Sequence, residues 1–308
     1  MGGEAMAVVK SKRRAAVRPE WVLLLIALMC LCLFLTMAVL CIPYYGSGEA
    51  ALSVPPTQEI QPTQEPEEPP EETVEVTIPP ELSPYNKWDF QYNHRNFILC
   101  TRQVSYPGID VSFYQRDIDW KKVKDSGIQF AMIRLGIRGW GMAGRLVEDE
   151  YAKQNLKGAQ EAGLAIGAYF FSQATTIDEV DDEISFLMSI LGDMPLDMPL
   201  VLDWERITED GSRSKDMDRR TLTDLLLHYC REVEAMGYQP MIYFNPNQAK
   251  TLLYLNELED YPFWLAFYTD RMTYPFRVEM WQYTNTGTVP GIEGEVDINL
   301  YIPDLTKK

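Results

Sequence analysis

The sequence predicts an α/β protein whose main domain is an irregular TIM-like barrel of five βα units followed by three β-strands, preceded by one transmembrane helix and a disordered linker. Three observations lead to this prediction: an apolar stretch without formal charge, a stretch rich in proline and glutamate after it, and an alternation of short apolar runs with longer helical segments. The expected regions are a basic tail at 1–20, a membrane anchor at 21–42, a disordered stalk at 43–84, an N-terminal extension at 85–103 and a globular domain at 104–308.

The predicted anchor at 21–42 contains 22 residues without Asp, Glu, Lys or Arg. A helix of that length spans roughly 33 Å, which is enough to cross a hydrocarbon core of about 30 Å. Five cations precede it within residues 1–20, so we expect a single-pass protein of the cell membrane, with a cytoplasmic N-terminus and an extracellular globular domain. The alternative is a cleaved signal peptide, but this apolar run is longer than the usual 7–15 residues or so and lacks a small-x-small cleavage site.

The predicted stalk has a composition that disfavours folding. Residues 46–84 contain nine prolines, nine glutamates and no lysine or arginine. Such a segment buries too little apolar surface to offset the entropy lost on ordering. Proline stiffens the chain and like charges extend it, so we expect a spacer.

Charge and cysteine content exclude some classes of function. Residues 85–308 carry a net charge of −11, which argues against a nucleic-acid partner because phosphate backbones require clustered Lys and Arg. Three of the five cysteines lie in the predicted anchor, which leaves Cys100 and Cys230. A disulfide between these two stays open, and neither has a neighbouring His in a nucleophile or metal pattern.

The barrel prediction rests on the order of the elements after residue 104. Thr176 with Glu179 three residues later predicts a capping box at a helix start, and glycines stand where the helices at 149–162, 176–191 and 217–236 should end. Expected strands are 107–111, 129–135, 165–171, 199–204 and 239–244, then 263–268, 278–283 and 295–300. Expected helices are 118–126, 149–162, 176–191, 217–236 and 246–257. Barrels of this kind place their chemistry at the carboxyl ends of the strands.

Four acidic residues stand at or near strand ends. Asp203 and Glu205 are separated by one residue, so in an extended strand both side chains point to one face, while Trp204 points to the other. Asp110 closes the first expected strand and Asp297 lies in the last. First and last strands are neighbours in a closed barrel, so we expect the four carboxyl groups at one mouth. The alternative for each acid alone is a solvated strand end.

Several carboxyl groups in one pocket raise one another's pKa, so that one stays protonated near neutral pH, as glycosidic bond cleavage requires. His94 and His228 lie away from this mouth, so a Ser-His-Asp site has no base. No spacing fits a metal or nucleotide site, and we expect no cofactor. Aromatic residues near strand ends offer faces for stacking on sugars: Tyr169, Tyr243, Trp264, Tyr268, Trp281 and Tyr283.

An ordered set of motifs over roughly 106–302 makes the resemblance specific. The motifs GIDVSFYQRDIDW, FAMIRLG, GAYFF, PLVLDWE, FWLAFY, WQYTNTG and VDIN occur in the order and spacing of the glycoside hydrolase family 25 lysozymes, which the domain resembles. The resemblance implies an irregular barrel and an N-acetylmuramidase that cleaves the β-1,4 bond between N-acetylmuramic acid and N-acetylglucosamine, with retention. Arg134-Leu135-Gly136 and the bulky Trp204 depart from the common family pattern.

The resemblance also implies roles for individual residues. Glu205 takes the place of the general acid, and Asp203 that of the partner that orients the substrate acetamido group. Asp110 and Asp297 match the two remaining acids of the pocket. The positions expected to bind substrate are Arg134, Tyr169, Tyr243, Trp264 and Gln282. The expected partner is the peptidoglycan glycan strand, and the catalytic domain is expected to be monomeric. The alternatives are a catalytically silent wall-binding module and a chitinase-like hydrolase, although the chitinase signature is incomplete here.

Overall fold

The computed structural model describes residues 80–304, which belong to one compact unit, Thr73–Lys308. The predicted tail and anchor, and residues 43–79 of the predicted stalk, lie outside the described residues. Within 80–304, none of the helices has the length and apolar character needed to cross a membrane.

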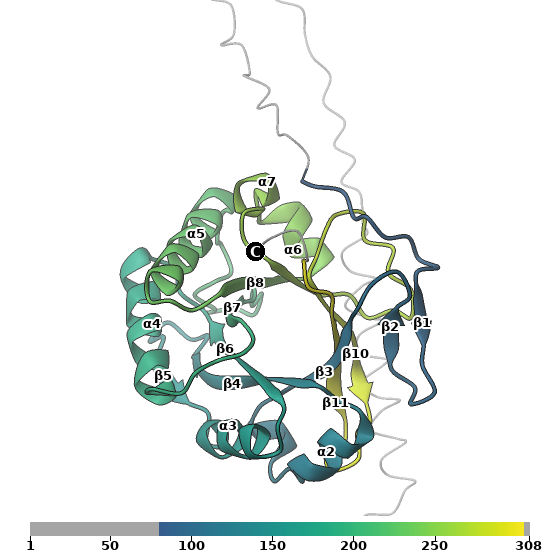
Figure 1. Cartoon of the computed structure of the whole chain (residues 1–308). Helices are drawn as coiled ribbons and strands as arrows, with labels where there is room; N and C mark the ends of the chain where they lie inside the picture. The colour runs from purple at the N-terminus through teal and green to yellow at the C-terminus, as the bar shows by residue number, and fades with distance from the viewer. Residues whose placement is uncertain (1–79, 305–308) are drawn as a thin grey trace, which may run out of the picture. The chain divides into compact units, whose positions relative to one another are not determined.

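Eight strands form a closed barrel, which Figure 1 shows from one end. Around the barrel the order is β3, β11, β10, β9, β8, β7, β6 and β4, and pairing of β3 with β4 closes the ring. Neighbouring strands are parallel except at β11, which runs antiparallel to both β10 and β3. The strands are β3 (Tyr106–Val111), β4 (Phe130–Arg138), β6 (Ala165–Ser172), β7 (Leu200–Trp204), β8 (Pro240–Phe244), β9 (Phe263–Ala266), β10 (Met280–Gly287) and β11 (Val296–Tyr301). The predicted α/β class and eight-stranded barrel are confirmed.

Helices surround the part of the barrel formed by the earlier strands (Figure 1). The helices are α2 (Trp120–Ser126), α3 (Ala152–Glu161), α4 (Ile177–Leu191), α5 (Arg219–Ala235), α6 (Pro246–Thr251) and α7 (Leu255–Leu258), with one 3-10 turn, η1 (Phe113–Gln115). Three of the longer helices start at a side chain that accepts a hydrogen bond from a backbone N–H group of the first turn: Asp119 for α2, Thr176 for α4 and Asp218 for α5. The helix α3 starts at Tyr151 without such a cap. Glu179 bonds back to Thr175, not to the cap residue itself.

Two features differ from the predicted simple alternation. A short strand, β5 (Leu146–Glu148), stands between β4 and α3 and pairs antiparallel with β4 outside the ring. The helix predicted at 246–257 is two short helices, α6 and α7, and the chain between them buries Leu252 and Leu253.

Alternation along the strands builds two apolar layers. One lies inside the barrel and includes Phe130, Met132, Val201 and Met280. The other lies between the barrel and the surrounding elements, and it contains Trp204 as expected. Trp281 and Tyr283 also belong to this outer layer. The expectation that these two aromatic residues lie at the mouth is wrong, because inward and outward positions alternate and Gln282 between them takes the inward one.

The N-terminal extension forms a hairpin that covers β10 on the side without helices (Figure 1). It consists of β1 (Phe90–Tyr92) and β2 (Ile98–Cys100). Phe90 packs edge-on against Trp281 with ring centroids 5.5 Å apart, and the Tyr283 hydroxyl accepts a hydrogen bond from the Ile98 N–H. Cys100 and Cys230 are both buried and free, so the disulfide left open by the sequence does not form.

Candidate active site

A cavity of about 210 Å³ lies at the end of the barrel where the parallel strands finish. All nine residues expected to be catalytic or to bind substrate line it: the acids Asp110, Asp203, Glu205 and Asp297, with Arg134, Tyr169, Tyr243, Trp264 and Gln282. Ser112, Tyr114, Phe171 and Tyr268 complete the lining. The structure therefore gathers side chains from all eight barrel strands or their ends around one small cavity.

The antiparallel direction of β11 explains how an acid near its start joins acids from strand ends. Asp297 is the second residue of β11, and because this strand runs against its neighbours, its beginning lies where they finish. Asp297 is paired directly with Asp110 across the β3–β11 ladder. Two ionised carboxylates directly opposite each other repel in a sheet, so this pairing favours the protonated form of one of the two acids.

Strand β7 supplies the other two acids. Asp203 is 7% exposed and Trp204, on the opposite face, is 2% exposed. The indole N–H of Trp204 donates to the carbonyl of Ala174 at 2.8 Å, which anchors it away from the cavity. Glu205 follows the last strand residue, is half-buried, and returns to the cavity face. The spacing of two in an extended chain thus places both carboxyl groups on one wall.

Asp110 is the most completely hydrogen-bonded of the four acids. Its Oδ2 accepts from Gln282 Nε2 and from Asn299 Nδ2, each at 2.8 Å. Burial raises the pKa of Asp110 to about 6, although the two amides oppose the rise by stabilising the carboxylate. Its orientation is therefore fixed from two sides.

The other three acids retain protons more strongly than free carboxyl groups. Burial, then the charges of Glu205 and Asp110, raise the pKa of Asp203 well above its ordinary value. Burial and the nearby Asp110 raise the pKa of Asp297 to about 8. Burial raises the pKa of Glu205, while a hydrogen bond with Asp203 works against the rise. Near neutral pH the cavity therefore holds both protonated and ionised carboxyl groups, which is what acid-assisted bond cleavage needs.

An aromatic and amide layer forms the floor. Trp264 is 1% exposed and donates its indole N–H to Asn299 Oδ1 at 2.8 Å. The Tyr169 and Tyr243 rings meet its indole edge-on, with centroid distances of 5.9 and 5.1 Å. A ring this deeply buried supports the floor and has no free face for a sugar. Tyr268, which is 53% exposed, has the more accessible ring.

Gln282 connects the floor to the acids. Its Oε1 accepts from the hydroxyls of Tyr243 and Tyr268, at 3.3 and 3.1 Å, and its Nε2 donates to Asp110. Asn299 plays the matching part on the other side of Asp110, between that acid and Trp264. The sequence analysis did not select Asn299. It is the second residue after Asp297 in β11, so strand alternation was the signal available for it.

Arg134 lines the cavity, but its guanidinium already forms an ion pair with Asp149. The guanidinium contacts Asp149 Oδ2 through both Nε and an NH2 group at 2.9 Å. The same carboxylate accepts from the backbone N–H groups of Phe113 and Tyr151, and Phe113 and Tyr114 lie under the guanidinium. Arg134 therefore holds the loop after β3 against β4. Asp149, which the sequence analysis missed, completes this arrangement.

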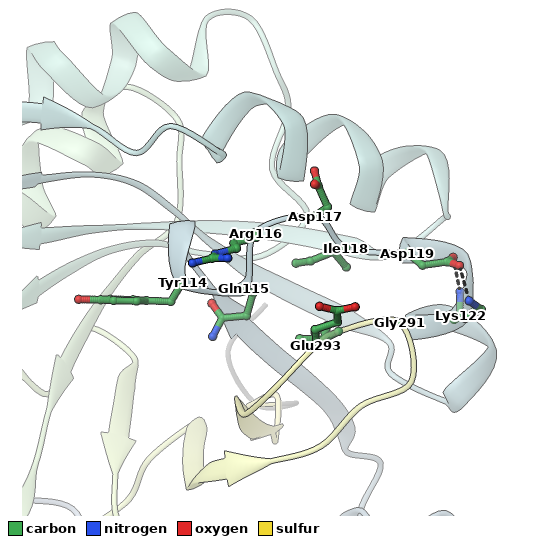
Figure 2. A pocket seen from close by; sticks show the side chains of 10 residues that line it. Tyr114, Gln115, Arg116, Asp117, Ile118, Asp119, Lys122, Gly291 and Glu293 are labelled. Carbon is green, nitrogen blue, oxygen red and sulfur yellow. Dashed lines mark hydrogen bonds and ion pairs between the residues drawn. The ribbon is translucent and has the colours of Figure 1, made fainter. Parts of the chain in front are cut away.

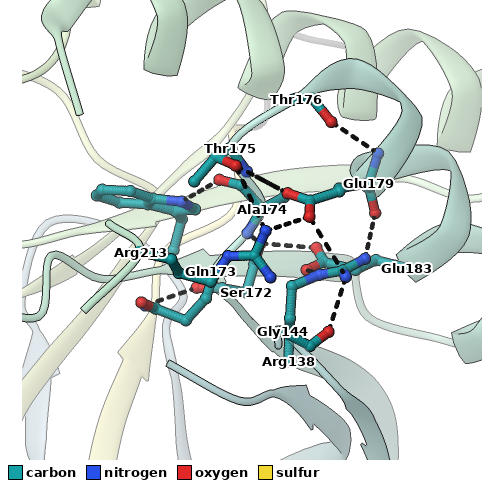
Figure 3. A network of polar contacts seen from close by, with 11 residues as sticks. Arg138, Gly144, Ser172, Gln173, Ala174, Thr175, Thr176, Glu179, Glu183 and Arg213 are labelled. Carbon is teal, nitrogen blue, oxygen red and sulfur yellow. Dashed lines mark hydrogen bonds and ion pairs between the residues drawn. The ribbon is translucent and has the colours of Figure 1, made fainter. Parts of the chain in front are cut away.

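A buried ionic network supports the segment that follows β6 (Figure 3). Arg138 donates to Glu183 at 2.6 Å and to the carbonyl of Gly144 at 2.9 Å. Glu183 also accepts from the Ser172 hydroxyl at 2.6 Å, and Glu179 pairs with Arg213. Helix α4, strands β4 and β6 and the long loop after β7 are thereby joined directly behind the catalytic cavity.

Comparisons with known proteins agree with this architecture. Residues 109–292 match the family described as Glycosyl hydrolases family 25. The uncharacterized protein YegX of Escherichia coli (strain K12) is 34% identical over 208 residues, which are 63% of this chain and 68% of YegX. The autolytic lysozyme of Clostridium acetobutylicum is 25% identical over 193 residues, 62% of this chain and 54% of that protein.

A solved structure supports the fold. The modular autolysin LytC from Streptococcus pneumoniae, in complex with a synthetic peptidoglycan ligand, superposes with a TM-score of 0.58 at 24% identity. The match covers 69% of this chain and 50% of the LytC chain, so this chain spans about half the length of that relative.

Proposed function

We propose that this chain, which belongs to glycosyl hydrolase family 25, is a peptidoglycan hydrolase that cleaves the β-1,4 bond between N-acetylmuramic acid and N-acetylglucosamine. The observation that carries the proposal is the group of four carboxyl groups, with raised pKa values, around one cavity. The lysozymes among its relatives support the same reaction class.

In this mechanism Glu205 is the general acid. It is the less buried member of the pair on β7, so a glycosidic oxygen in the cavity can reach it, and its raised pKa keeps the proton available. Asp203 orients the 2-acetamido group of the substrate, whose carbonyl oxygen attacks the anomeric carbon. As the bond to the leaving oxygen breaks, Glu205 transfers its proton to that oxygen. Glu205 then takes a proton from the water that opens the cyclic intermediate, which gives net retention.

The remaining acids and the floor position the sugar. Asp110, held by Gln282 and Asn299, presents a carboxylate of fixed direction, and Asp297 opposite it adds a carboxyl group protonated near neutral pH. The exposed ring of Tyr268 offers a stacking surface. Arg134 acts through the loop after β3, because its guanidinium is bound to Asp149.

The replacement Glu205→Gln tests the assignment of the acid. It preserves shape and removes the transferable proton, so we expect release of reducing sugar from purified peptidoglycan to fall by about 10²- to 10⁴-fold. Glu209→Gln is the matched control, since this exposed glutamate lies in the next loop and does not line the cavity. Activity of Glu205→Gln near that of the unchanged protein excludes Glu205 as the acid.

The bond cleaved is tested by mass analysis of the fragments. We expect N-acetylmuramic acid at the new reducing ends. N-acetylglucosamine there, or chitin oligomers cleaved as fast as peptidoglycan, favours the chitinase-like alternative. Binding to the wall without new reducing ends favours the silent binding module.

We further propose that residues 21–42 anchor the enzyme in the cell membrane with the catalytic domain outside. The support is the uncharged apolar run preceded by cations. Fractionation of cells that express the full chain tests this, with a variant lacking 1–42 as the comparison. Release of the full chain from membranes by salt alone contradicts an anchor.

A further inference from the structure

We propose that a second cleft, next to the catalytic cavity, binds the peptide stem of the substrate through Arg116 and Glu293. This inference rests on the proposed peptidoglycan substrate. The cleft has a volume of about 860 Å³ and lies between the loop after β3 and the loop before β11 (Figure 2). Tyr114 lines both the cleft and the catalytic cavity, so the two adjoin each other at this residue.

The two walls of the cleft are tied together at both ends. At the far end the Asp119 N–H donates to the carbonyl of Gly291 at 2.8 Å. A Cβ on Gly291 would lie 2.4 Å from the Asp119 oxygen, so this close approach requires glycine. Nearer the catalytic cavity, Gln115 Nε2 donates to the carbonyl of Glu295 at 3.2 Å. The cleft is therefore a built feature of the two loops.

Most charges along the cleft are already paired. Asp119 caps α2 and pairs with Lys122 at 3.0 Å, and Asp117 accepts from Gln154 at 3.0 Å. Arg116 and Glu293 differ: within residues 80–304, neither side chain makes a hydrogen bond or ion pair. One cation and one anion without a partner in this part of the chain thus remain, Arg116 on the loop after β3 and Glu293 on the loop before β11 (Figure 2).

The backbone at Arg116 strengthens the case for a binding role. Its φ is +51° with ψ at −130°, in the region that favours glycine. A non-glycine residue in such a conformation carries strain, and strain of this kind concentrates at functional sites. No interaction within the described chain accounts for an arginine at this position. An anionic ligand that pairs with the guanidinium would account for it.

The peptide stem of peptidoglycan has the matching chemistry. It is attached to N-acetylmuramic acid, one of the two sugars at the cleaved bond, so it lies close to the catalytic cavity when that bond is bound there. It carries carboxylates and, on its diamino acid, an amine. Arg116 provides a planar donor for a carboxylate, and Glu293 an acceptor for the ammonium group. A bare glycan chain carries neither an ammonium group nor this density of carboxylates.

The first test measures binding alone. The probe is synthetic L-alanyl-γ-D-glutamyl-L-lysyl-D-alanine, titrated against the full chain and followed by NMR shifts. We expect the Arg116→Gly variant to bind at least fivefold more weakly, without loss of thermal stability because glycine relieves the strained φ. Glu293→Gln should weaken binding similarly, and Arg116→Lys should restore part of it. Lys121→Ala, on the exposed face of α2, is the matched control.

The second test compares stem-bearing glycan with the same glycan stripped of peptide. Arg116→Gly should lower kcat/KM about five- to tenfold on stem-bearing chains and leave it unchanged on stripped chains. Equal losses on both substrates, or no binding of the probe to the unchanged protein, overturn the inference. If the unchanged protein cleaves neither substrate but binds the probe through Arg116, the hydrolytic function fails and the cleft assignment stands.

A separate observation concerns how Glu205 is held. The ladder from β7 to β8 ends at Leu202 and the ladder to β6 ends at Trp204. At the end of β7, two buried glutamine side chains donate hydrogen bonds to backbone carbonyls in place of a neighbouring strand. Gln248 Nε2 donates to the Trp204 carbonyl at 2.6 Å, and Gln173 Nε2 donates to the Glu205 carbonyl at 2.5 Å. We infer that these glutamines are positioning residues that extend the sheet and aim Glu205.

Both glutamines are themselves held in place. Gln173 Nε2 also donates to the carbonyl of Ser172 at 3.0 Å, and the Ser172 hydroxyl is bonded to Glu183 in the buried network (Figure 3). Gln248 accepts from Asn245 at the start of α6. The two side chains are 0% and 4% exposed, so water does not replace them as donors.

Separate measurement of kcat and KM distinguishes a positioning role of these glutamines from a merely structural one. Gln173→Met has similar shape and no donor, and we expect kcat to fall at least tenfold with KM within twofold. Val233→Ala, in the core of α5, is the control for lost stability and should keep its kcat. Gln173→Glu regains a donor when protonated, so its activity should recover toward acidic pH relative to the unchanged protein. A kcat for Gln173→Met no lower than that of Val233→Ala, or no such recovery, refutes the role.

Discussion

Replacing Asp297 by Asn should make the protein more stable at alkaline pH. Asp297 lies directly opposite Asp110 in the β3–β11 ladder. Burial and that neighbour raise its pKa from 3.8 to about 8. Between these values the folded protein holds a proton that the unfolded chain has released, so stability falls as the pH rises toward 8. Asparagine does not titrate and avoids this loss.

The size of the effect follows from the pKa difference. A difference of about four units corresponds to roughly 6 kcal/mol at most. Because Asp297 is partly exposed and shares its interaction with Asp110, screening lowers the effect to about 2–3 kcal/mol. For a domain of this size, about 2–4 °C per kcal/mol then gives a rise in Tm of about 5–10 °C at pH 8 or above.

Thermal unfolding of the full chain and of Asp297→Asn, followed by circular dichroism from pH 4 to pH 9, is the assay. The two proteins should melt within a few degrees of each other at pH 4, and the variant should melt higher at pH 8. A variant that melts below the unchanged protein at pH 8, or an unchanged protein that gains stability between pH 5 and pH 8, refutes the reasoning.

Three further outcomes are expected. Asn299→Leu removes a donor from buried Asp110, so the pKa of Asp110 should rise further and stability at pH 7 should fall by about 1–3 kcal/mol, measured by denaturant titration and by the pH profile of activity. Arg138→Met leaves Glu183 buried without its partner, which should cost about 3–5 kcal/mol in unfolding free energy at pH 8 and less at pH 5, where Glu183, with a pKa of about 7, is protonated. The thiol of Cys230 is buried with a raised pKa, so it should react with a thiol reagent only after denaturation, and a reductant should leave Tm unchanged.

Some of the site was accessible from strand alternation alone. The spacing of two between Asp203 and Glu205 placed both on one face because a strand has a period of two, and Trp204 faces the helices for the same reason. The alternation of inward and outward positions also explains why two of the predicted stacking residues lie away from the cavity. Trp281 and Tyr283 lie at positions whose inward neighbour is Gln282, a register that aromatic content does not reveal.

Other parts depended on contacts between distant segments. The pairing of Asp149 with Arg134, and the two glutamines that hold the end of β7, join residues from different loops and helices. Nothing in the local pattern of a glutamine distinguishes a ladder extension from a solvated side chain.

The order of strands and helices and the identity of the four acids were determined by the sequence itself, because periodicity and strand-end position are properties of short segments. The tertiary structure decided the rest: the antiparallel direction of β11 sets Asp297 against Asp110, and closure of the ring buries Asp110 and half-buries Asp297. Only that enclosure turns four ordinary acids into carboxyl groups that hold protons near neutral pH, since desolvation is a property of the assembled barrel.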